Sequence, residues 1–136
     1  MNKSLLFLTL ILPFFSCSDG RQDWEDEWEE HSNDFKKVVQ LYKENKLQRR
    51  TDGLYKIPDS INLNYQPEKY VFIHKDTVTD ESFTLSFYLD STIEPNNNNI
   101  IVYTDNNRIV EFYRNPPFPV TKIEEHWYFV YYKATY

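Results

Sequence analysis

Residues 82–89 read Ser-Phe-Thr-Leu-Ser-Phe-Tyr-Leu, and their regular alternation decides the fold class. Successive side chains of a β-strand point to opposite faces of the sheet, so every second residue shares a face. One face receives Phe83, Leu85, Phe87 and Leu89, and the other receives Thr84, Ser86 and Tyr88. The pattern predicts a half-buried strand in a sheet with one covered face.

Further strand candidates flank this stretch and are separated by residues that favour turns. They are residues 54–57, 70–75, 100–104, 108–113 and 127–134. Residues 105–107 read Asp-Asn-Asn, and because asparagine tolerates positive φ they predict a tight hairpin between the strands on either side. The proline-rich residues 115–119 predict an extended connection. Residues 127–134 are apolar on both faces, which is typical of a central or helix-covered strand.

A helical repeat precedes the strands. Apolar or aromatic residues recur at alternating spacings of four and three residues, namely Trp24, Trp28, His31, Phe35, Val38 and Tyr42. The firmer helix is predicted to begin near Asp34, with a cap at 32–34, and to end at residues 51–53, Thr-Asp-Gly. Its apolar face comprises Phe35, Val38, Val39, Tyr42 and Leu47.

One N-terminal helix followed by five or six antiparallel strands predicts an α+β domain. The helix is expected to pack on the concave side of a curled antiparallel meander. A cystatin-like roll and a half-open barrel are two variants of this arrangement.

The first residues have the character of a secretory signal. Lys3 precedes an apolar run from Leu5 to Phe15, which is too short for a membrane span of roughly 20 residues. Ser16 and Cys17 follow this run. The segment resembles a bacterial lipoprotein signal peptide with a relaxed lipobox, in which Phe14 and Phe15 replace the usual residues. The resemblance implies cleavage before Cys17 and lipidation of that cysteine.

Cys17 is also the only cysteine, so the chain can form no internal disulfide. A lipid acceptor needs no thiol partner, whereas an unpaired thiol would be unusual in an exported protein. Ordinary signal cleavage after Ser18 is the alternative, because Ser16 and Ser18 form a small-x-small pattern. The expected location is the bacterial cell envelope, with the bilayer as a partner through acylated Cys17.

The expected domain organisation has three parts. Residues 1–16 form the signal peptide, residues 17–33 an acidic tether that can be partly helical, and residues 34–136 a single α+β domain. The tether assignment depends on the density of carboxylates in residues 18–34. The full chain carries a net charge of −6, which excludes an electrostatic attraction for nucleic acid.

No constellation of catalytic or metal-binding residues stands out, and no cofactor is predicted. His31, His74 and His126 lack metal-ligand spacing. The carboxylates near strand ends and turns are Asp90, Glu94, Asp105, Glu111, Glu124 and Glu125. The sequence Glu124-Glu125-His126-Trp127 is the most site-like cluster, and it is interpreted as a charged turn leading into a strand whose tryptophan fills the core.

Three functions are therefore weighed. The first is a membrane-anchored, non-enzymatic module that binds another envelope protein. The second is a small glycan-binding module that uses exposed aromatic rings, and its candidate surface is Tyr103, Tyr113, Trp127, Tyr128, Tyr131 and Tyr132. The third is a hydrolase that uses two carboxylates about 5–10 Å apart.

Overall fold

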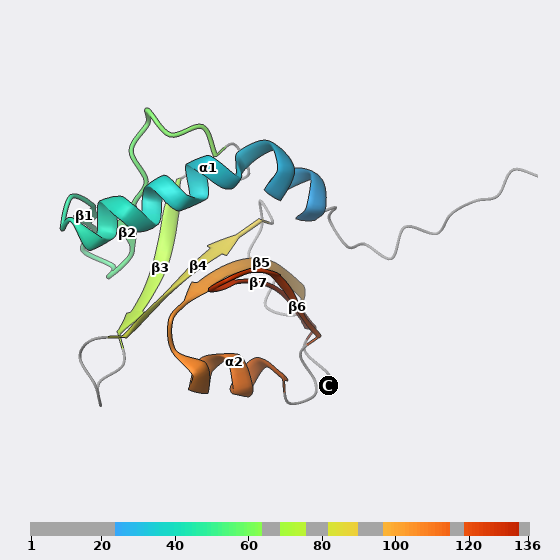
Figure 1. The fold of residues 1–136 in the computed structure, drawn as a ribbon. Helices are drawn as coiled ribbons and strands as arrows, with labels where there is room; N and C mark the ends of the chain where they lie inside the picture. Colours follow the sequence, from blue (N-terminus) through green and yellow to red (C-terminus); the bar gives the residue numbers. More distant parts are fainter. Residues whose placement is uncertain (1–23, 64–68, 76–81, 90–96, 115–118, 134–136) are drawn as a thin grey trace, which may run out of the picture.

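The computed structural model describes residues 24–63, 69–75, 82–89, 97–114 and 119–133 (Figure 1). The helices are α1 (Trp24–Lys43) and α2 (Asn107–Arg114). The strands are β1 (Gln48–Arg49), β2 (Tyr55–Lys56), β3 (Tyr70–Lys75), β4 (Phe83–Tyr88), β5 (Asn97–Thr104), β6 (Val120–Glu124) and β7 (Trp127–Lys133). The predicted signal peptide and Cys17 lie outside the described residues.

The described strands form one antiparallel sheet of seven strands in the order β1-β2-β3-β4-β5-β7-β6. The predicted α+β class, with an N-terminal helix on a curled antiparallel sheet, is confirmed. The chain meanders from β1 to β5. It then runs through α2 to the far edge, and β7 returns to pair between β5 and β6. This insertion places β7 in the interior of the sheet, as its two apolar faces predict.

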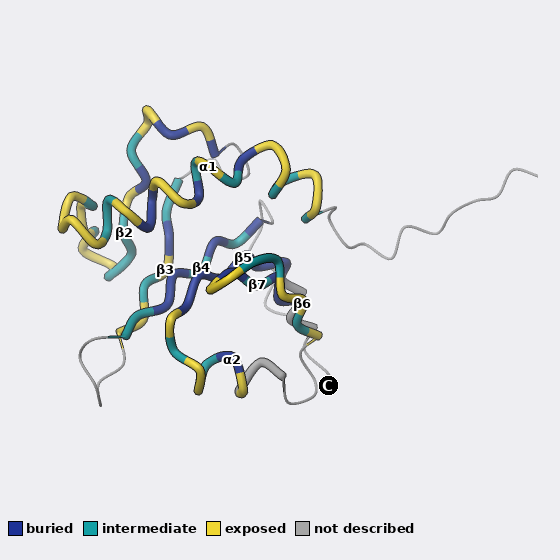
Figure 2. Tube along the Cα trace, in the orientation of Figure 1, coloured by how far each residue is buried: buried dark blue, intermediate teal, exposed yellow. Residues whose placement is uncertain are grey.

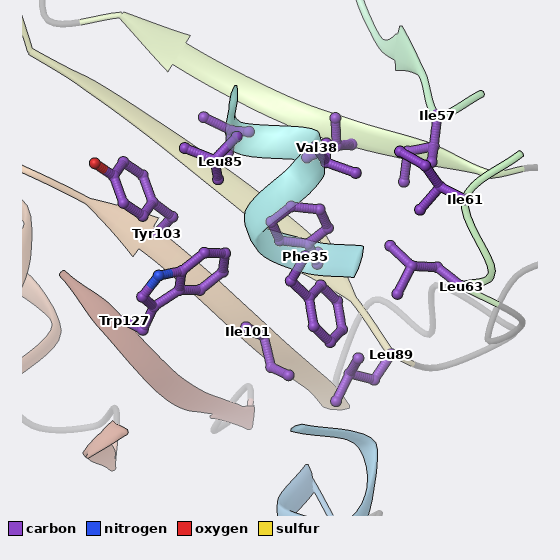
Figure 3. Packing of buried hydrophobic residues seen from close by; sticks show 13 residues of the cluster. Phe35, Val38, Ile57, Ile61, Leu63, Leu85, Leu89, Ile101, Tyr103 and Trp127 are labelled. Atoms are coloured by element: carbon purple, nitrogen blue, oxygen red, sulfur yellow. The ribbon is translucent and has the colours of Figure 1, made fainter. Parts of the chain in front are cut away.

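Helix α1 crosses one face of the sheet and closes the main core (Figures 1 and 2). Phe35 and Val38 of α1 are fully buried against residues of β4 such as Leu85 and Phe87 (Figure 3). The Phe35 ring meets the Phe87 ring edge to face, with 5.0 Å between the centroids. The alternation of residues 82–89 thus decides which face receives the helix.

Helix α1 begins at Trp24, earlier than the firm start predicted near Asp34. Aromatic contacts explain the extension. The Trp24 ring stacks on Phe129, with 5.2 Å between the centroids, and Trp28 lies 5.0 Å from Trp127. Residues 24–33 are therefore a packed part of the α+β body, and only residues 17–23 of the predicted tether lie outside the description.

The same helix ends at Lys43, before the predicted end at residues 51–53. Asn45 adopts a left-handed conformation with φ of 55°. Its N–H donates to the carbonyl of Tyr42, and the N–H of Lys46 donates to the carbonyl of Leu41. This is the hydrogen-bond pattern of a Schellman cap, in which a left-handed residue stops the helix.

The hairpin predicted around residues 105–107 is wrong, because residues 107–114 form helix α2. Asn106 caps this helix: its side-chain Oδ1 accepts a hydrogen bond from the N–H of Arg108 at 2.9 Å. The Asn106 amide group also donates to the Ser82 hydroxyl at 3.2 Å. Asparagine favours helix N-caps as well as turns, so the same residues fit both structures.

A second, smaller core lies on the sheet face opposite α1. It comprises Ile100 and Val102 of β5 and Val130 of β7, with Tyr88 and Val120 packed against it. Val110 of α2 is buried, and Figure 1 shows α2 on this side of the sheet, below β5 and β7. Strand β7 thus contributes buried residues to both cores, Trp127 to the main core and Val130 to the smaller one.

Candidate functional site

The aromatic residues proposed as a stacking surface do not share one exposed face in the described part of the chain. Tyr103 and Trp127 are only 7% and 3% exposed and pair across β5 and β7 beneath α1. Tyr128 and Tyr131 occupy positions of opposite parity on β7 and so point to opposite faces. The side chains of Tyr113 and Tyr132 lie outside the described residues. Two of the proposed rings are thus core residues.

A different aromatic cluster, with one exposed ring and two half-buried ones, lies on the sheet face opposite α1. We call it the Phe72 surface and define it as Tyr70, Phe72, Ser86 and Tyr88. Phe72 is 47% exposed and is the exposed large apolar residue among the described side chains. It lies opposite Ser86 in the β3–β4 register, and its ring meets Tyr88 at 5.8 Å between centroids.

A cation contacts one of the rings beside Phe72. The guanidinium carbon of Arg50 lies 5.8 Å from the centroid of the Tyr70 ring. Burial, and then the proximity of Tyr70, raises the pKa of the Tyr88 hydroxyl above its ordinary value, so this group is uncharged at neutral pH, as an ordinary tyrosine is. The cluster offers an apolar ring bordered by neutral hydroxyl groups, a composition suited to protein binding.

Sequence reasoning missed this surface although a signal was present. Phe72 lies between Val71 and Ile73 in a strand. Val71 belongs to the main core, and Ile73 packs against it. Alternation therefore places Phe72 on the other face. Helix α2 packs on the same face near β5, as Figure 1 shows, and that it leaves Phe72 of β3 exposed could only be learned from the structure.

The cluster from Glu124 to Trp127 forms the turn between β6 and β7. Trp127 fills the main core, and His126 is in the left-handed region with φ of 66°. Glu124 pairs with Lys36 of α1 at 2.8 Å, and the Glu125 carboxylate lies 3.8 Å from the His126 ring. The interpretation as a charged turn leading into a core tryptophan is confirmed.

The histidines are separated from one another. His31 is 7% exposed on α1, and His74 is exposed on β3. The carboxylates within 4.0 Å of the His31 ring nitrogens all belong to α1 and are those of Glu27, Glu30 and Asp34. Across the described ranges, no group of three or more His, Cys, Asp or Glu side chains is placed to hold a metal ion.

The carboxylates considered for hydrolysis have structural partners where they are described. Asp105 accepts a hydrogen bond from the N–H of Phe83 at 3.1 Å, at the start of β4. Glu124 is held by Lys36. Asp90 and Glu94 lie outside the described residues.

Comparison with protein-family models, with curated proteins and with solved structures found no match to this chain. Within the part that the structure describes, no helix is both long enough and apolar enough to cross a bilayer.

Proposed function

We propose that this chain is a lipid-anchored protein of the bacterial cell envelope whose α+β domain binds another protein and catalyses no reaction. The anchor is supported by the sequence, through the apolar run that ends in Ser16-Cys17. Binding is supported by one structural observation, the exposed ring of Phe72 on the face opposite α1.

The position of Phe72 carries the argument. Exposed apolar residues that occur singly are ordinary, but the exposed Phe72 ring adjoins the half-buried ring of Tyr88 and so extends an apolar patch, a feature that favours an interaction surface. The Phe72 and Tyr88 rings are inclined by 62°, so they do not form the flat platform on which a sugar ring stacks. Their arrangement favours a side chain of a protein partner that inserts against both rings.

Site-specific photo-crosslinking in the native host tests the surface. A photoreactive residue at position 72 should give a discrete adduct with one envelope protein. The matched control is position 37, where Lys37 is exposed on α1. Moving the photoreactive residue to position 86 should preserve the adduct, and adding Phe72→Ser should abolish it. Equal labelling from positions 72 and 37 would refute the proposed surface.

Intact-mass spectrometry of protein from the membrane fraction tests the anchor separately. The expected mass is that of residues 17–136 plus acyl groups, and Cys17→Ala should abolish it. A chain that begins at Asp19 without lipid would show a soluble exported protein and would overturn the anchor.

A further inference from the structure

Lys43 of α1 and Tyr103 of β5 meet at the edge of the main core. The Lys43 ammonium donates a hydrogen bond to the Tyr103 hydroxyl at 3.0 Å. It also lies 5.1 Å from the centroid of the Tyr103 ring and 5.8 Å from that of Phe83. Lys43 is an exposed residue, and the described groups that its ammonium contacts are aromatic rings and a hydroxyl, with no carboxylate within ion-pair distance.

Tyr103 is held in a fixed position. Its ring stacks on Phe83 at 5.7 Å and meets Trp127 edge to face at 5.2 Å. Figure 3 shows the ring beside Trp127, with the hydroxyl oxygen at the outer end of the cluster. That oxygen accepts the bond from Lys43, and no described residue accepts the hydroxyl proton. A tyrosine buried to this extent normally donates to a partner.

Two hydrogen-bond donors thus lie next to each other, and each has an N–H or O–H group that no described residue accepts. An ammonium group has three N–H donors, of which Tyr103 uses one, and the phenol contributes its O–H. Charge-assisted bonds from such donors favour an anionic oxygen. We propose that Lys43 and Tyr103 form a binding site for a carboxylate group. The site lies on the α1 side of the sheet and does not depend on the Phe72 surface.

The surrounding charges select the kind of anion. Glu124 is neutralised by Lys36 at 2.8 Å, and Glu125 is 87% exposed beside His126. The chain as a whole is acidic, with a net charge of −6. One cation and one neutral donor in this field suit a monoanionic carboxylate better than a phosphate dianion. Because the site is small, its dissociation constant for a carboxylate should be about millimolar.

Two sources could supply the carboxylate: a free small acid, or an aspartate or glutamate side chain of a protein. NMR titration of the isotope-labelled full chain distinguishes them. Sodium acetate and the blocked peptide acetyl-Ala-Glu-Ala-amide are added at constant ionic strength, with sodium chloride as the reference. Saturable shifts at Lys43, Phe83 and Tyr103 are expected with either probe. Equal affinity points to a free acid, and clearly tighter peptide binding points to a protein side chain.

Variants complete the test. Tyr103→Phe keeps the ring and removes the donor, and Lys43→Gln removes the charge; each should weaken binding at least about tenfold. Lys43→Arg should retain binding, as should the control Lys37→Gln elsewhere on α1. The proposal is overturned if the shifts do not saturate, if chloride reproduces them, or if Tyr103→Phe binds as well as the natural chain.

Discussion

Tyr42 carries a hydroxyl group that is buried with no hydrogen-bond partner among the described residues. Its ring packs edge to face on Tyr55 and Phe83. Burying an unpaired hydroxyl costs free energy, because water no longer solvates it. Replacing Tyr42 with Phe should therefore raise the free energy of unfolding by about 1 kcal/mol. Urea denaturation at pH 7 measures this change.

The same substitution has a pH signature. Desolvation, and then the neighbouring Tyr55, raises the pKa of Tyr42 in the folded state. An unfolded tyrosine titrates at about pH 10, so above that pH the unfolded chain loses its proton first. Tyr42 therefore adds no pH dependence to stability below about pH 10, and it lowers the free energy of unfolding further as the pH rises through and above that value. Wild type should lose stability more steeply than Tyr42→Phe in that range; parallel curves would contradict the assignment.

For single residues, the sequence predicts the face of the sheet to which a side chain points. It does not predict which other groups contact the side chain on that face. The alternation of residues 82–89 places Leu85 and Phe87 correctly in the core. Nothing local shows that Tyr103 is covered by α1 while Phe72 is exposed. That difference depends on contacts between residues distant in the sequence.

At the scale of the element, Asn45 decides where α1 ends. Glycine adopts the left-handed conformation at the lowest free-energy cost of any residue, because it has no Cβ. Asn45→Gly should stabilise the protein by a few tenths of a kcal/mol, whereas Asn45→Ala should destabilise it by about 1 kcal/mol. Thermal unfolding of the two variants measures the difference. Equal midpoints would mean that Asn45 does not cap the helix.

The N-terminal half of α1 is expected to contribute more to the free energy of unfolding than the cap at Asn45 does. The Trp28 ring packs on Phe35 and Trp127, so Trp28→Ala should lower the free energy of unfolding by about 2–4 kcal/mol. Glu25→Ala, at an exposed position of the first turn, is the control and should change it by less than about 0.5 kcal/mol. A Trp28→Ala variant as stable as this control would restore residues 24–33 to the tether.

Elements also show how far the sequence pattern predicts the structure. The stripe of Trp24, Trp28 and Phe35 predicts that the helix runs back into the acidic residues before Asp34, which are expected to form a tether that can be partly helical, and residues 24–33 are helical. Those carboxylates occupy the exposed sides of the same turns. For residues 107–114, an asparagine-rich start and a short apolar pattern fit a hairpin or a capped helix. The pairing of β5 with β7 decided between them.

At the scale of the whole molecule, charge is unevenly distributed along α1. Its first turns are rich in carboxylates, and basic residues gather after its middle. The acidic residues are Glu25, Asp26, Glu27, Glu29, Glu30 and Asp34, and the basic ones are Lys36, Lys37 and Lys43. Under the proposed anchor, the acidic end lies nearer the bilayer. Anionic headgroups would repel this end, and the repulsion would weaken at high ionic strength.

The start of α1 limits how far the domain can stand from that bilayer. Seven residue steps separate Cys17 from Trp24, and at no more than about 3.6 Å each they span at most ~25 Å. Trp24 and Trp28 lie at this end of α1, and Trp127 packs against Trp28, so all three tryptophans of the chain gather there. Tryptophan fluorescence therefore reports the distance between this end and the membrane.

We expect efficient energy transfer from these tryptophans to dansyl-labelled headgroups when the lipidated protein is reconstituted in vesicles. A flexible Gly/Ser insertion of about twelve residues between Ser18 and Asp19 has an r.m.s. end-to-end distance of its own of roughly 20 Å, so it lengthens the connector and should lower the transfer. Cys17→Ala, which does not bind the vesicles, gives the baseline. Transfer that is unchanged by the insertion would mean that the domain contacts the bilayer through its own surface, and the connector would then not determine its position.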